Sequence, residues 1–159
     1  LWALEKFAQV ANYLAEKHGA RPVIIGTGRD SREVTTMIEN LDSSVRAINT
    51  LDKLSLDELK ALISKLKLFI SADTGPIYIA EALGVPTVDI LGPVKEMVQP
   101  PQGKFHKVVF ISRARGELGV LDNIPSDKKE ALRQSDEITV PMVTKVLDEL
   151  IPLIKNEPD

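Results

Sequence analysis

Residues 68–91, LFISADTGPIYIAEALGVPTVDIL, decide the fold of this chain. The stretch opens with an apolar run typical of a strand that is buried on both faces of a parallel sheet. Pro76 pre-sets the first turn of a short helix, and Gly84 ends it. A second apolar run follows at residues 87–91. The order strand, turn, helix, strand predicts a parallel βαβ unit.

The same alternation continues on both sides of this unit. Apolar periodicity predicts helices near residues 4–18, 31–40, 55–66 and 141–151. Gly19 is expected to end the first, Ser31 to cap the second, and Ser55 with Glu58 to form a capping box at the start of the third. Apolar runs predict strands near 22–26, 45–48 and 108–111. Residues 92–107 are rich in Pro, Gly, Gln and Lys and indicate a surface loop, whereas residues 113–135 are polar and poorly periodic. About five strands separated by helices predict an α/β fold, a Rossmann-like doubly wound parallel sheet.

Composition excludes several classes of protein. A length of 159 residues fits a single domain, and 43% hydrophobic with 27% charged residues is typical of a globular chain. A net charge of -3 gives no positive field for nucleic acid, so we expect no nucleic-acid partner. The chain has no cysteine, only two histidines and no Asp-x-Asp pair, so we expect no metal. No apolar run approaches the ~20 residues that span a bilayer.

The turn after residue 71 is the main candidate site. Ligands of parallel α/β sheets bind beyond the carboxyl ends of the strands. There, Asp73 or Thr74 could cap the following helix, and Gly75 permits close approach of another group. The amide groups and the positive dipole at such a helix start suit a phosphate or diphosphate. From spacing alone, a capped turn without any ligand explains these residues equally well.

A second glycine-rich turn lies at Gly26-Thr27-Gly28. It is only part of a dinucleotide fingerprint, because the third glycine and the acidic residue that should end the next strand are missing. The pattern therefore disfavours a nicotinamide enzyme.

The same residues resemble a known family. Residues 68–93 are similar to the signature of glycosyltransferase family nine, the ADP-heptose:lipopolysaccharide heptosyltransferases. That signature is an apolar strand, Asp-Ser/Thr-Gly-Pro, an apolar residue, His, an Ala-rich turn, Leu-Gly-x-Pro-Thr and Gly-Pro, and Tyr78 stands where the family has His. The family layout is also followed by Trp2 before a helix, by residues 24–30 and by residues 54–59. The resemblance covers residues 1–93 and the last helix, but not residues 94–135.

This resemblance implies the C-terminal, donor-binding half of a GT-B glycosyltransferase. Residues 1–159 would form one nucleotide-sugar-binding domain, a fragment without its N-terminal acceptor domain; the chain also begins at Leu1 without an initiator methionine. Asp73 would contact donor-sugar hydroxyls, and Thr74 and Gly75 would hold the diphosphate. Tyr78 would donate to a phosphate or sugar oxygen, or else pack on the helix. The residues near the nucleoside would be Gly26, Gly28, Arg29 and Asp30.

The resemblance further implies an inverting transfer of heptose, or a related sugar, from a nucleotide diphosphate, ADP-heptose, to a lipopolysaccharide-core acceptor. No metal or other cofactor is required. The catalytic base would be an acidic residue of the missing N-terminal half, so this fragment alone would be inactive and contains no catalytic residue. We expect a cytoplasmic protein that is peripheral at the inner membrane face in its full length.

Two other functions fit the sequence. One is half of a nucleotide-sugar epimerase, which shares the GT-B architecture. The other is a degenerate, non-catalytic sugar-nucleotide-binding module, suggested by Tyr78 and by the dissimilar residues 94–135.

Overall fold

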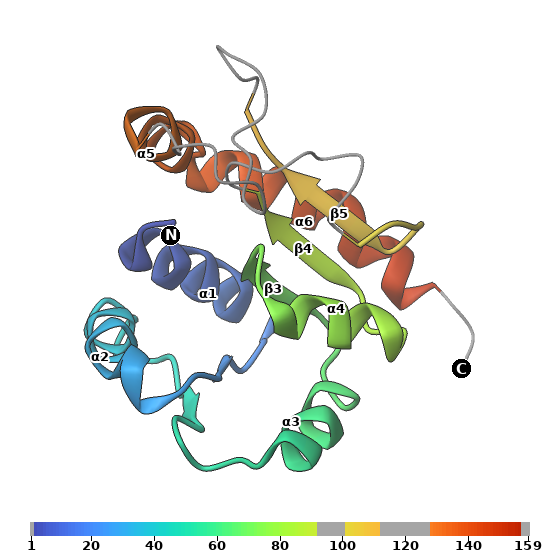
Figure 1. Ribbon diagram of the computed structural model, residues 1–159. Helices are drawn as coiled ribbons and strands as arrows, with labels where there is room; N and C mark the ends of the chain where they lie inside the picture. The colour runs from blue at the N-terminus through green and yellow to red at the C-terminus, as the bar shows by residue number, and fades with distance from the viewer. Residues whose placement is uncertain (1, 92–100, 112–127, 157–159) are drawn as a thin grey trace. The chain divides into compact units, whose positions relative to one another are not determined.

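The computed structural model describes residues 2–91, 101–111 and 128–156 (Figure 1). The chain divides into two compact units, one of residues 3–59 and one of residues 1–2 with 60–159. Most of the expected loop at 92–107 and of the dissimilar segment 94–135 lies outside the described residues.

The unit of residues 3–59 is built from helices and a two-stranded parallel sheet. It contains α1 (Leu4–His18), β1 (Val23–Ile24), the 3₁₀ turn η1 (Gly28–Asp30), α2 (Ser31–Glu39) and β2 (Ile48–Asn49). Val23 of β1 lies opposite Ile48 of β2, and α1 contacts α2. Helix α1 ends at Gly19, whose φ of 63° is a left-handed conformation that glycine adopts without strain.

Helix α3 (Leu56–Ile63) crosses the division between the units and begins with the predicted capping box. The Ser55 amide donates to Glu58 Oε2 at 2.8 Å, and the Glu58 amide donates to Ser55 Oγ at 3.3 Å. The side chain of each residue thus accepts a hydrogen bond from the backbone amide of the other, and both amides at the helix start gain a partner. The bonds from Ser55 hold the pKa of Glu58 below its usual value.

The second unit holds a three-stranded parallel sheet in the order β3-β4-β5. Its elements are β3 (Phe69–Ala72), α4 (Gly75–Ala82), β4 (Thr87–Ile90), β5 (His106–Val109), α5 (Lys128–Glu137) and α6 (Val140–Lys155). Ser71 of β3 lies in register with Asp89 of β4. Helix α4 contacts β3 and β4, and α6 contacts β4 and β5, passing behind them in Figure 1.

The core of this unit lies around the central strand. Every residue of β4 is buried, as are Val143, Leu147 and Leu150 of α6. Trp2, only 3% exposed, donates its indole N–H to the Ile138 carbonyl at 2.9 Å. A buried indole needs such a partner, and the bond contributes about 1 kcal/mol.

The predicted fold class is confirmed, with three differences of detail. The five strands form two parallel sheets, one in each unit, among the residues described. Helix α5 lies where the sequence shows no periodicity, because charged and polar residues dominate it and leave no apolar stripe to detect. Ser31 does not cap α2, since η1 runs directly into that helix and Thr27 with Asp30 forms the capping box instead.

Candidate functional site

The turn between β3 and α4 has an unusual hydrogen-bonding arrangement. Thr74 occupies the N-cap position, yet its side chain makes no cap bond to α4. Ser71 donates its hydroxyl to the Ala72 carbonyl at 2.7 Å, so the contact of 2.8 Å between Ser71 Oγ and Thr74 Oγ1 takes its hydrogen from Thr74. The Asp73 carboxylate instead accepts a bond from Tyr78. The interpretation of this turn as a side-chain-capped helix start is therefore wrong.

This arrangement leaves the start of α4 open to a ligand. No side chain among the described residues caps its first amide groups. A Cβ added at Gly75 would meet nothing within 4 Å, so the space beside Gly75 is open and no other backbone approaches it. The unsatisfied amides and the helix dipole place partial positive charge there, which favours an anion.

Tyr78 and Asp73 form a pair on the surface of this turn. The Tyr78 hydroxyl donates to Asp73 Oδ1 at 3.0 Å, and Tyr78 is 38% exposed. Partial burial, together with the bond to Asp73 and its charge, raises the pKa of Tyr78 to about 12. Tyr78 is thus a neutral donor at physiological pH that orients the Asp73 carboxylate, and it does not merely pack on the helix.

A buried carboxyl group, Asp89, lies in β4 in register with Ser71 of β3. It is fully buried in β4, and neither of its oxygens has a hydrogen-bond partner among the described residues. Burial, and secondarily the charge of Asp73, raises the pKa of Asp89 to about 7. Asp89 was not predicted as a site residue, although a lone charged residue inside an apolar strand run is a signal that could have identified it.

The second predicted group lies in the turn after β1. The Gly28 amide donates to Asp52 Oδ1 at 2.6 Å, and a Cβ at Gly28 would collide with the Asp52 carboxylate. The absence of a side chain at position 28 therefore lets the Asp52 carboxylate approach this backbone closely. Asp52, which has a φ of 53°, was not predicted, because its contact with Gly28 arises only when β1 and β2 pair.

Asp30 has a structural bond within this turn. Its Oδ2 accepts from the Thr27 amide at 2.8 Å and from the Thr27 hydroxyl at 3.0 Å. These bonds, more than the neighbouring Arg29 charge, lower the pKa of Asp30, so the group is ionised at neutral pH. Arg29 is exposed.

The predicted site residues thus fall into two groups. The structure brings Asp73, Thr74, Gly75 and Tyr78 together in one unit, and Gly26, Gly28, Arg29 and Asp30 together in the other. Each group follows the carboxyl end of a parallel strand, where α/β proteins bind ligands.

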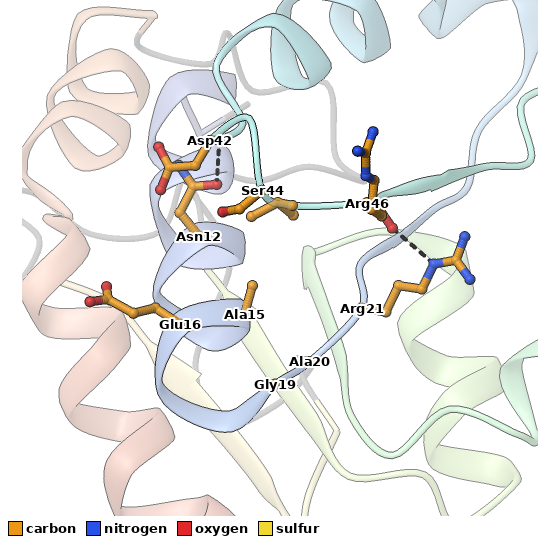
Figure 2. A pocket seen from close by; sticks show the side chains of 10 residues that line it. Asn12, Ala15, Glu16, Gly19, Ala20, Arg21, Asp42, Ser44 and Arg46 are labelled. Atoms are coloured by element: carbon orange, nitrogen blue, oxygen red, sulfur yellow. Dashed lines mark hydrogen bonds between the residues drawn. The ribbon is translucent and has the colours of Figure 1, made fainter.

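A hollow of about 650 Å³ in the unit of residues 3–59 contains none of these residues (Figure 2). It is lined by α1 residues such as Asn12 and Glu16 and by the segments that precede β1 and β2. Arg21 Nε donates to the Arg46 carbonyl at 2.9 Å across its edge. The hollow therefore adjoins the amino ends of β1 and β2, away from the predicted site.

The described part of the chain has neither a cluster of metal-ligating side chains nor a membrane-spanning helix. No group of three or more His, Asp or Glu residues there is arranged to hold a metal ion. None of its helices is both long and apolar enough to cross a membrane.

Comparisons with known proteins agree on one family. Residues 1–118 match the family model described as glycosyltransferase family 9 (heptosyltransferase). The chain is 30% identical over 122 residues to the lipopolysaccharide core heptosyltransferase OpsX of Haemophilus influenzae, covering 74% of this chain. A family 9 glycosyltransferase structure from Veillonella parvula matches at 25% identity with a TM-score of 0.73 over 94% of the chain. The E. coli ADP-heptose LPS heptosyltransferase II shares the fold, at 21% identity with a TM-score of 0.78 over 97% of the chain.

The chain spans only part of these proteins. It covers 34% of the H. influenzae protein, 41% of the V. parvula chain and 43% of the E. coli chain.

The buried Asp89 should make stability depend on pH in a specific direction. The pKa of an aspartate in an unfolded chain is about 3.9. Between about pH 4 and 7 the folded state therefore keeps a proton that the unfolded state has lost. The stabilising effect of this proton is fully present below pH 4 and declines by ~1 kcal/mol per pH unit until it is gone above pH 7.

We expect Asp89→Asn to remove this decline. Urea titrations should show that the free energy of unfolding of Asp89→Asn, minus that of the parent chain, increases by ~3 kcal/mol between pH 4.5 and pH 8. The exposed Glu149→Gln on α6 is a matched control that should track the parent. If the free energies of unfolding of Asp89→Asn and the parent changed in parallel with pH, the pKa of Asp89 would not be raised in the folded state.

Proposed function

The chain belongs to glycosyltransferase family 9, and from this membership we propose that it forms the donor-binding half of an inverting heptosyltransferase. The donor is a nucleotide diphosphate sugar, ADP-heptose or a close relative. The acceptor is the lipopolysaccharide core, which binds through the remainder of a longer protein. The names of the matched H. influenzae and E. coli proteins support this substrate pair.

The observation that carries the proposal is the open start of α4 beside an oriented carboxylate. The donor diphosphate accepts hydrogen bonds from the amides at Thr74 and Gly75, in the space that Gly75 leaves open. The leaving ADP gains negative charge as the bond to the sugar breaks, and these amides with the helix dipole stabilise that charge. No metal ion is needed for this stabilisation.

Asp73 supplies the contact with the sugar. Its Oδ1 is held by Tyr78, which leaves Oδ2 to accept hydrogen bonds from sugar hydroxyls. The side chain is half-buried, which strengthens such bonds relative to water. Fixing the carboxylate beforehand reduces the entropy lost when the sugar binds.

The turn after β1 binds the nucleoside in this proposal. Asp30 has both of its described bonds on Oδ2, which leaves Oδ1 to accept a hydrogen bond from a ribose hydroxyl, and the exposed Arg29 is its neighbour in the chain. Gly26 and Gly28 keep the backbone of the turn close to the ligand.

The base that removes the acceptor proton lies in this scheme in the N-terminal part of the longer protein. The chain alone binds donor but transfers no sugar. The full-length protein works in the cytoplasm, peripheral at the inner membrane face where its acceptor is assembled. A non-catalytic binding module would share the same donor site, and a transfer assay on the full-length protein separates the two functions.

The role of Asp73 predicts a selective loss of sugar affinity. In the full-length protein, Asp73→Asn keeps the shape of the side chain but replaces one acceptor oxygen with a donor. ADP-heptose binding should weaken by about 1–3 kcal/mol, while ADP should bind almost as before. Calorimetry on both ligands measures the difference, with Glu149→Gln as control. Equal loss of both affinities would contradict a contact between Asp73 and the sugar.

The amide-based account also predicts that donor binding is independent of divalent cations. ADP-heptose affinity should be the same with 5 mM EDTA as with millimolar Mg²⁺, to within about twofold, because helix amides replace the cation. A large loss of affinity on chelation would contradict the account.

A further inference from the structure

Asp89 is placed to influence the proposed diphosphate site. It lies in register beside Ser71, and neighbouring residues in register project from the same face of a sheet. Ser71 in turn contacts Thr74, the residue at the start of α4, at 2.8 Å between the two hydroxyl oxygens. Ser71 is thus both in register with Asp89 and in contact with the residue at the start of α4, where the turn is open to an anion.

The surroundings of Asp89 offer no compensation for a negative charge. The carboxyl is fully buried and unpartnered among the described residues. After burial, the group that raises the pKa of Asp89 is Asp73 in the turn that follows β3, and Asp73 is itself acidic. The other titratable groups on the packed elements are Tyr78 and Glu81 of α4, His106 and Lys107 of β5, and the exposed Lys145, Asp148, Glu149 and Lys155 of α6.

These neighbours leave protonation as the way to neutralise Asp89. Besides burial and the bond to Asp73, the negative charges of Asp73, Asp89 and Glu81 raise the pKa of Tyr78. The three carboxyl groups therefore all act electrostatically on the same side chain. His106 is bonded through Nδ1 to Thr87 at 2.9 Å, at the amino end of β4, and burial lowers its pKa. It is therefore neutral above pH 7 and adds no positive charge.

We propose that Asp89 sets the affinity of this site for the donor diphosphate, which binds tightly only when Asp89 is protonated. This inference rests on the proposed donor site at α4. A diphosphate adds negative charge close to Asp73 and Asp89, and each added negative charge makes the ionised form of the buried Asp89 less favourable. Donor binding then draws a proton onto Asp89 whenever that group is ionised in the free protein.

The direction of the pH effect follows from this linkage. At pH 6 Asp89 is already neutral, and the donor binds at full affinity. As the pH rises through 7 the carboxyl ionises, and binding must first restore the proton. Affinity should fall by roughly tenfold between pH 6 and pH 8.5, which corresponds to a shift of one pKa unit on binding.

Calorimetry with ADP-heptose tests the proposal directly. Its diphosphate is a diester without a group that titrates near pH 7, so any proton taken up binds to the protein. The titration is run at pH 7.5 in two buffers of different ionisation enthalpy, and the difference in apparent enthalpy gives the protons taken up. We expect a fractional uptake for the parent chain and for Glu149→Gln, and none for Asp89→Asn.

Affinities measured across pH 6–8.5 complete the test. Asp89→Asn should bind ADP-heptose with the same affinity throughout, and about tenfold more tightly than the parent at pH 8.5. Binding without proton uptake by the parent, or uptake that persists in Asp89→Asn, would overturn the role of Asp89 and leave the donor site intact. A failure of all three chains to bind ADP-heptose at any pH would overturn the donor site and this inference together.

Discussion

The hydrogen bond from Tyr78 to Asp73 governs the chemistry of the turn after β3. It holds the carboxylate away from the amides of α4, where an aspartate at a helix start ordinarily binds. The threonine at the N-cap is likewise turned to Ser71. Both side chains that could neutralise the helix start are engaged elsewhere, so its partial positive charge remains for a ligand.

Tyrosine in this role differs physically from the histidine of the family signature. Its hydroxyl stays protonated, since its pKa is raised to about 12, and it acts as a neutral donor across the physiological range. A histidine at the same position could carry a positive charge that compensates neighbouring carboxylates. Without such a cation, the negative charge of Asp73 adds to the effect of burial in raising the pKa of Asp89, so the protonation of Asp89 matters to the proposed binding of an anion nearby.

Sequence patterns predicted the regular elements well because their signals are local. The βαβ unit, the Gly19 stop and the Ser55–Glu58 capping box depend on residues a few positions apart. The missed features depend on contacts between distant segments or lack a pattern. Asp52 reaches Gly28 only through the pairing of β1 with β2, and α5 has no apolar stripe. The bond between Tyr78 and Asp73 depends on side-chain orientation, which residue spacing does not specify.

An NMR titration of the chain with ADP tests the central claim most directly, because it reports each amide separately. The account predicts that millimolar ADP shifts the amide resonances of Thr74, Gly75 and Tyr78, together with those of residues 26–30. Shifts centred instead on the hollow between Asn12 and Arg46, or no shifts at millimolar ADP, would contradict it.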